Sequence, residues 1–165
     1  IGHIQVNENG PLCRCGNYGC LEIMAGHANC VEKFKQDIRK GITKISDSIP
    51  IDDIDITSLQ DEAMNGNVVA RRILFDAATY IGICMSLIVN ILNPSKIVFG
   101  QGYANFSEEL MDMIIEVVNN KVMRVYKSKF NIVNSNSSEN AIALGAAIIP
   151  IRPLFGEGKG IFELD

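Results

Sequence analysis

Apolar residues recur at helical spacing in the second half of the chain. After Ser107, a residue type that caps helices, one face of the pattern is apolar at positions i, i+3, i+4, i+7 and i+8. A longer and mostly apolar stretch covers residues 68–92; it follows Asn67, another capping type, and stops before Asn93-Pro94. Both patterns predict α-helices. The residues of the first apolar face are Leu110, Met113, Ile114, Val117 and Val118.

Shorter elements account for most of the remaining pattern. Thr57 followed three residues later by Gln60 matches a capping box and predicts a helix over residues 57–65. Short apolar runs predict strands, and two more helical segments lie nearer the ends of the chain. The expected strands are 4–6, 96–99 and 130–133, and the further helices are 21–40 and 140–149. Alternation of strands and helices at these lengths is typical of an α/β layer fold.

Composition narrows the class of protein. The 165 residues are 47% hydrophobic and 21% charged, which excludes a disordered chain. The net charge is −4, whereas a free-standing nucleic-acid-binding protein is expected to carry a basic surface. The composition therefore argues against such a protein. The uncharged stretch between Asp76 and Lys96 contains polar residues and Pro94, so we expect a buried helix and no membrane partner. The length fits one domain or one lobe of a two-lobed protein, and the start at Ile1 suggests a segment of something longer.

Cys13, Cys15 and Cys20 lie in one short, glycine-rich loop. Cys13 and Cys15 are too close along the chain to pair well, and three cysteines cannot all pair within the loop. A soft divalent metal fits the trio better, since Zn²⁺ takes four ligands and Cys₃His is a common structural set. Gly16 and Gly19 would supply positive φ where the thiolates converge. Cys30 and Cys84 fall in predicted helices and are expected to be buried thiols.

Two histidines compete for the fourth ligand position. His3 precedes a turn-rich stretch that can fold back on the cysteines, whereas His27 lies in a helix about two turns beyond Cys20. We favour His3, with His27 and an unliganded trio as the alternatives. Four protein ligands leave no open position for water, so such an ion would hold the loop together and would not catalyse a reaction.

These residues carry a family resemblance. The motif G-H-x9-C-x-C-G-x-x-G-C-L-E over residues 2–22 resembles the signature of the ROK family, which joins sugar-responsive bacterial repressors with sugar kinases. Matching motifs follow in order: N-G-N-x-x-A-x-x-I-L, L-N-P-x-x-I-V-F-G-x-G and A-L-G-A-A. The resemblance implies the C-terminal lobe of an actin-like, ribonuclease H-like α/β fold over residues 1–149, with a zinc loop at about 3–22 and a tail at 150–165.

The resemblance also implies site residues. It assigns zinc to His3, Cys13, Cys15 and Cys20, and it assigns contacts with sugar hydroxyls to His3 and Glu22. A carboxylate accepts two hydroxyl hydrogen bonds, so the role suits Glu22. The alternative for Glu22 is a charge in the first turn of a helix that binds no ligand.

A possible nucleotide contact lies at the turn after the strand 96–99. Gly100 and Gly102 match a glycine-rich turn that lies beside the nucleotide in ROK kinases. Many such turns have a third glycine at the position of Gln101. Tight-turn packing without a ligand explains these glycines equally well. No catalytic residue is expected here, because the phosphate loop and the catalytic Asp of the kinases would precede Ile1. This chain alone should not phosphorylate a substrate.

Two readings of function follow from the resemblance. The favoured one is the sugar-effector-binding and oligomerisation domain of a cytoplasmic transcriptional repressor of the xylose or N-acetylglucosamine type. It would contact DNA only through an N-terminal helix-turn-helix and would form a dimer or tetramer. Residues 39–46, at the end of the predicted helix 21–40, resemble the longer connection that follows this helix in the regulators. The alternative is the same lobe of a glucokinase- or fructokinase-like enzyme, with ATP and Mg²⁺ as its cofactors. A third, outside the family, is a zinc-stabilised interaction module.

Overall fold

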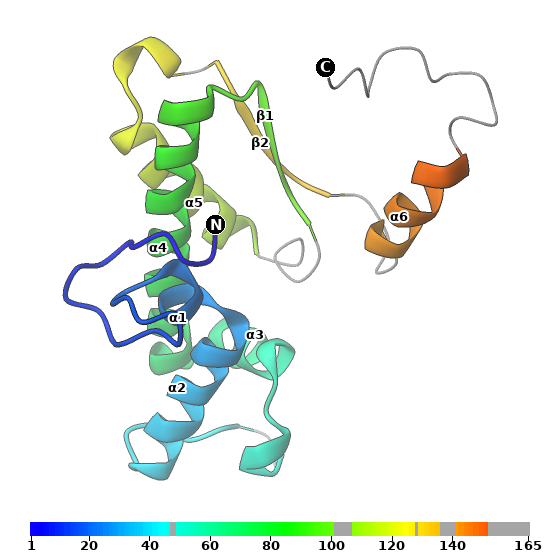
Figure 1. Cartoon of the computed structure of the whole chain (residues 1–165). Coiled ribbons are helices and arrows are strands. Elements are labelled where there is room, and N and C mark those ends of the chain that lie inside the picture. The colour runs from blue at the N-terminus through cyan, green and yellow to red at the C-terminus, as the bar shows by residue number, and fades with distance from the viewer. Residues whose placement is uncertain (47–48, 101–106, 128, 136–140, 152–165) are drawn as a thin grey trace. The chain divides into compact units, whose positions relative to one another are not determined.

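The helices predicted from the apolar pattern make up most of the structure, a computed structural model (Figure 1). It describes residues 1–46, 49–100, 107–127, 129–135 and 141–151. The chain divides into two compact units. The first comprises Ile1–Ser95 and Phe106–Asn131, and the second Lys96–Asn105 and Ile132–Asp165.

Helix α4 (Val68–Leu92) is the long central helix of the first unit, shown in green in Figure 1. The Asn67 side chain accepts hydrogen bonds from the backbone N–H groups of Val69 and Ala70. The helix ends at Asn93, which adopts φ 45° directly before Pro94. Both ends are confirmed as predicted, because both signals are local to the sequence.

Helix α4 is also, among the described residues, the one helix long and apolar enough to cross a bilayer. Of its most apolar window, 56% is buried inside the protein, as in the core helix of a soluble protein. It contacts α1, α2, α3 and α5, which cover it from several sides. Length and composition alone therefore give weak support for a membrane span.

Helix α5 (Glu108–Lys121) packs along α4. The Ser107 hydroxyl accepts from the Leu110 N–H, so the predicted cap is confirmed. Leu110, Ile114 and Val118 of the predicted apolar face are buried. The two helices lie in close contact at Gly82, where a Cβ would lie 2.7 Å from the Val117 Cβ.

The prediction of one helix over residues 21–40 is wrong. The segment forms α1 (Leu21–Ala25) and α2 (His27–Arg39), separated by Gly26 in an extended conformation with ψ 138°. Gly26 N–H donates to the Glu22 carbonyl, and a Cβ on Gly26 would lie 2.4 Å from that oxygen. The glycine therefore allows a turn too tight for other residues, which helical periodicity cannot reveal.

The predicted capping box at Thr57 and Gln60 is also wrong. Helix α3 (Ile56–Met64) follows the short 3₁₀ helix η1 (Ile51–Asp53), and its cap is Asp55. The Asp55 carboxylate accepts from the Ser58 N–H at 2.8 Å, and Asp55 N–H donates to the Ser58 hydroxyl. The bond from the Ser58 N–H lowers the pKa of Asp55. An ionised carboxylate at a helix N-terminus also interacts favourably with the helix dipole.

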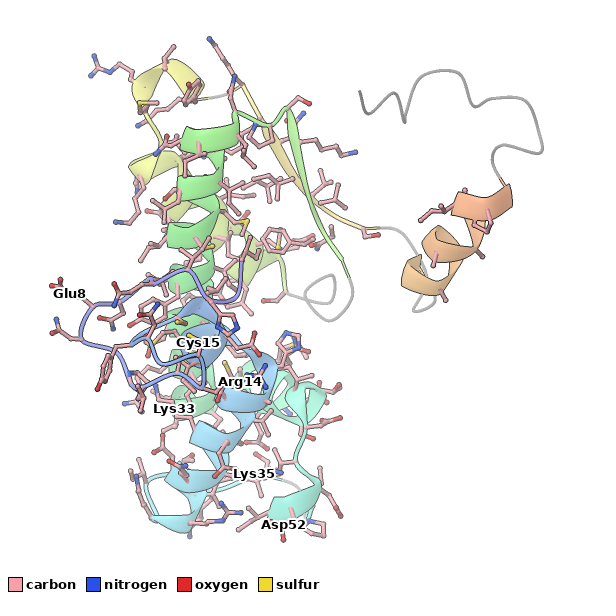
Figure 2. All side chains as sticks on the ribbon, viewed as in Figure 1. Glu8, Arg14, Cys15, Lys33, Lys35 and Asp52 are labelled. Atoms are coloured by element: carbon pink, nitrogen blue, oxygen red, sulfur yellow. The ribbon has the colours of Figure 1, made fainter. Side chains whose placement is uncertain are left out.

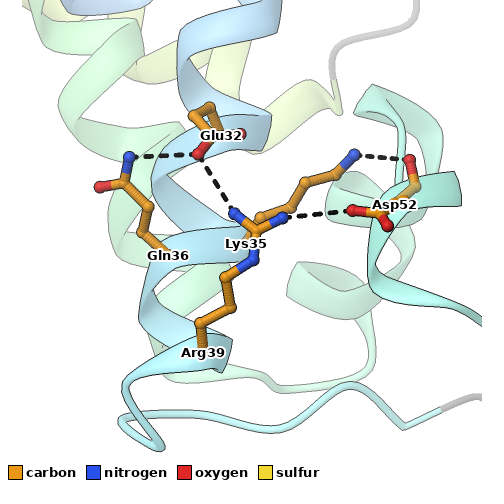
Figure 3. A network of polar contacts seen from close by, with 5 residues as sticks. All are labelled: Glu32, Lys35, Gln36, Arg39 and Asp52. Atoms are coloured by element: carbon orange, nitrogen blue, oxygen red, sulfur yellow. Dashed lines mark hydrogen bonds and ion pairs between the residues drawn. The ribbon is translucent and has the colours of Figure 1, made fainter.

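Polar contacts join α2 to η1 on the surface (Figure 3). Arg39 bonds to Glu32 at 3.3 Å and to the Asp52 carboxylate at 3.2 Å, and Lys35 donates to the Asp52 carbonyl at 2.8 Å. Gln36 donates to the same Glu32 carboxylate. The basic side chains of this face are thus partly neutralised by acidic neighbours.

Two paired strands, β1 (Lys96–Phe99) and β2 (Asn131–Asn134), and helix α6 (Ala141–Ile151) belong to the second unit, apart from Asn131, the last residue of the first unit. The strands run parallel, because Asn131 N–H donates to Ser95 and Ser135 N–H donates to Phe99 at the same sequence offset. Strand β2 begins one residue later than predicted, and α6 extends past 149 to include Pro150. The predicted strand at 4–6 is absent; Gln5 forms only an isolated bridge with Cys20.

Candidate metal centre

Residues 1–20 fold into a loop held by backbone hydrogen bonds in place of regular secondary structure. Antiparallel bridges join Gln5 to Cys20 and Leu12 to Tyr18. Gly16 and Gly19 adopt φ +90° and +57°, which confirms the predicted positive values. At Gly19 a Cβ would lie 1.6 Å from the Asn7 carbonyl oxygen, so the loop cannot close around another residue type.

The loop brings together the four predicted ligands. The Nδ1 or Nε2 of His3 and the sulfurs of Cys13, Cys15 and Cys20 all lie within 4.8 Å of one another. The Cys13 sulfur is 3.7 Å from His3 Nδ1, and the Cys15 and Cys20 sulfurs are 3.5 Å apart. A tetrahedral zinc site with Zn–S near 2.3 Å and Zn–N near 2.0 Å has edges of roughly 3.5–3.8 Å. The donor set therefore fits one tetrahedral ion.

Charge and burial at these sulfurs also suit a cation. Cys13 and Cys20 are buried, whereas Cys15 and His3 are exposed. Burial raises the pKa of the Cys20 thiol to about 12, because a thiolate is poorly solvated there. A hydrogen bond from the Asn17 backbone lowers the pKa of Cys15. A divalent cation among these sulfurs would offset the cost of burying thiolates.

The remaining cysteines and the second histidine lie apart from this cluster. All five cysteines are free thiols in the structure, and Cys30 and Cys84 are buried as expected. Burial raises the pKa of Cys30 to about 11. His27 begins α2 and is not one of the four clustered ligands; burial lowers its pKa.

Glu22 lies in the first turn of α1, directly beside the cluster. Its N–H donates to the Gly2 carbonyl at 2.7 Å, and a Cβ on Gly2 would lie 3.0 Å from Glu22 Oε2. The carboxylate therefore lies next to the residue that precedes His3. Its Oε1 is 3.6 Å from the guanidinium of Arg14, a neighbour that sequence reasoning missed (Figure 2). Because Arg14 lies between the predicted ligands Cys13 and Cys15 in the sequence, it could have been expected close to the site.

The candidate nucleotide turn is only partly described. Gly100 follows β1 as expected, is exposed, and has nothing within 4 Å of where a Cβ would lie. Gly102 lies outside the described residues. The nucleotide contact stays a prediction.

Comparison with known families gives one match, to the ROK family over residues 1–152. The chain belongs to the ROK family. It is 26% identical to the DNA-binding transcriptional repressor Mlc and 27% identical to the dual regulator NagC, both from Escherichia coli, over 90% and 93% of its length. It is 30% identical to a glucokinase of Thermotoga maritima over 90% of its length. The chain spans 36%, 37% and 48% of these relatives, in that order.

Solved structures of ROK proteins share the fold. A ROK transcriptional regulator described as a homologue of Escherichia coli Mlc superposes with a TM-score of 0.78 at 27% identity, over 90% of this chain and 37% of that one. A ROK hexokinase from Thermus thermophilus superposes with a TM-score of 0.70 at 24% identity, over 89% of this chain and 46% of that one. The predicted α/β fold of the ROK regulators and actin-like sugar kinases is confirmed.

Proposed function

We propose that this chain is the sugar-effector-binding lobe of a ROK transcriptional regulator and that His3, Cys13, Cys15 and Cys20 hold a structural zinc ion. The lobe would extend over residues 1–149. The distances between the four donors and the burial of Cys20 support the metal assignment. When bound, zinc would supply a fixed anchor for a loop that has little apolar core of its own.

The sugar would bind beside this anchor. Glu22 offers two acceptor oxygens for sugar hydroxyls, and the free nitrogen of a metal-bound His3 offers one more polar contact. One observation supports this site most directly. The Glu22 N–H donates to the Gly2 carbonyl at 2.7 Å, and this bond joins the segment that contains His3 to the first turn of α1. This bond supports a shared site for the two proposed sugar contacts, one on the loop and one on α1.

Calorimetric titration of the full-length protein tests the sugar site. The probes are N-acetylglucosamine, xylose and glucose, chosen from the names of related repressors and a related kinase. Glu22→Gln should weaken binding of the recognised sugar by roughly 10- to 100-fold, the loss expected for a charge-assisted hydrogen bond. The control is Glu8→Gln, which changes an exposed carboxylate of the neighbouring loop over residues 1–20 (Figure 2). Equal losses in the two variants, or none in Glu22→Gln, would contradict the site.

A regulator of this kind would act on DNA through another part of the protein. We infer a cytoplasmic homo-oligomer in which an N-terminal helix-turn-helix binds an operator and the sugar shifts the lobe between conformations. The likeness to a ROK transcriptional regulator, at 27% identity, supports this reading. Operator affinity of the full-length protein should change when the recognised sugar is added.

The second candidate is the C-terminal lobe of a ROK sugar kinase that uses ATP and Mg²⁺. The 30% identity to a glucokinase favours it. The full-length protein separates the two: sugar-dependent hydrolysis of ATP with formation of a sugar phosphate would establish the kinase. Operator binding without such turnover would support the regulator.

A further inference from the structure

The four clustered ligands differ in their access to solvent. Cys20 is fully buried and Cys13 nearly so, but Cys15 is exposed on the turn that Gly16 closes. A Cβ on Gly16 would meet nothing within 4 Å, so the space next to Cys15 is open. Figure 2 shows Cys15 and Arg14 together on this loop. Cys15 is therefore the cysteine of the cluster that is most open to a small solute.

The buried sulfur of Cys20 lies immediately behind the exposed one. The two sulfurs are 3.5 Å apart, whereas a disulfide bond is about 2.05 Å long. Closing the difference requires a shift of roughly 1.5 Å, and the intervening residues include the two positive-φ glycines. Cys13 is a poorer partner for Cys15, because only one residue separates them along the chain.

We infer that Cys15 is a site of oxidative modification by hydroperoxides and that Cys20 completes the reaction by forming a Cys15–Cys20 disulfide. This inference rests on the proposed zinc ligands. The disulfide would remove two of the four donors at once. It would thereby release the loop whose Gly2 carbonyl bonds to the Glu22 N–H of α1, and it would couple sugar binding to oxidation.

The chemistry requires one equivalent of hydroperoxide for each disulfide. The Cys15 sulfur attacks the peroxide, so that an S–O bond forms, the O–O bond breaks, and the peroxide leaves as an alcohol or, for hydrogen peroxide, as water. The Cys20 sulfur, as a thiolate, then attacks the Cys15 sulfur; the S–S bond forms, the S–O bond breaks, and the leaving hydroxide takes a proton from solvent and becomes water. Two sulfurs are oxidised by one electron each, and the peroxide accepts both electrons.

Peptide mapping of the full-length protein tests this inference. Its zinc content is measured first; the protein then receives hydrogen peroxide, remaining thiols are alkylated, and the digest is analysed by mass spectrometry. Trypsin cuts after Arg14 and separates Cys13 from Cys15, while chymotrypsin cuts after Tyr18 and separates Cys15 from Cys20. A disulfide between the last two therefore holds two chymotryptic peptides together.

We expect the Cys15–Cys20 disulfide to appear together with a tenfold or greater fall in retained zinc, both reversed by dithiothreitol and added zinc. Cys30→Ser, which removes a buried thiol outside the cluster, should behave like the wild type. A zinc-loaded protein that forms a disulfide through another cysteine, or that accumulates sulfinic acid at Cys15, would overturn the inference. Protein with no zinc before oxidation would instead contradict the proposed metal site.

Discussion

The loop over residues 1–20 and the helices around α4 differ in what can hold them together. In the loop the buried hydrophobic side chains are those of Cys13 and Cys20, while the large apolar side chains of Ile1 and Leu12 are 73% and 60% exposed. Helix α4 buries apolar residues from Ala70 to Val89 against its neighbouring helices. Apolar burial therefore stabilises the helices, and the loop needs another source of stability. The clustered ligands can supply it.

Loss of a ligand should have the largest effect. Cys20→Ser is expected to lower bound zinc from one ion per chain to almost none and to destabilise the loop by more than about 5 kcal/mol, given zinc-site energies of roughly 10–16 kcal/mol. Metal analysis and hydrogen exchange of the loop amides measure both effects. Cys30→Ser is the matched control, since it removes a buried thiol from α2 and should keep the zinc. Equal zinc content in the two variants would contradict the claim that the loop, unlike the helices, is stabilised by a bound metal.

A core substitution in α3 should destabilise the protein without touching the metal. Leu59 is fully buried, so Leu59→Ala should lower the free energy of unfolding by about 2–5 kcal/mol. Met64→Ala in the same helix changes a 70% exposed side chain and should have little effect. Denaturant titration with and without a chelator measures these values. Loss of zinc from Leu59→Ala in the folded protein would show that the two regions are not independent.

The same substitution at two helical glycines should have opposite effects. Gly82→Ala places a Cβ 2.7 Å from Val117 on α5, so we expect a net loss of about 1–2 kcal/mol. Gly145→Ala in α6 meets nothing within 4 Å and should stabilise its helix by roughly 0.5–1 kcal/mol. Thermal unfolding compares the variants. A stabilising Gly82→Ala would contradict the close contact between α4 and α5.

The smallest effect concerns the helix cap in α3. Asp55→Ala should cost about 1 kcal/mol at neutral pH, whereas Asp53→Ala in η1 should change stability little. The folded protein holds the pKa of Asp55 below its ordinary 3.8, so the cap stabilises the fold above that value. The contribution disappears as the pH falls through the lower, folded-state pKa. Unfolding curves at several pH values should therefore converge for wild type and variant in acid.

Local signals in the sequence predicted much of the fold. The bounds of α4 follow from Asn67 and Pro94, and the cap of α5 follows from Ser107, because each acts through neighbouring residues. The three cysteines were predicted to cluster because a soft divalent metal suits such a trio, and His3 because the turn-rich stretch after it can fold back on them. Their role as metal ligands, and those of Glu22 and Gly100, stay predictions.

Other features depend on contacts that the pattern does not contain. Gly26 divides α1 from α2 because the Glu22 carbonyl leaves no space for a side chain, a contact absent from helical periodicity. At α3, Thr57 and Gln60 match a capping box in the sequence, but Asp55 forms the actual one with Ser58. The register of β2 depends on pairing with β1, more than thirty residues earlier in the chain. Tertiary contacts override local sequence preferences in these cases.

X-ray absorption at the zinc edge, on protein purified without chelators, tests the central claim most directly. The account predicts one zinc ion per chain with three sulfur neighbours at about 2.3 Å and one nitrogen at about 2.0 Å. Absence of zinc, or a coordination shell made only of nitrogen and oxygen, would contradict it.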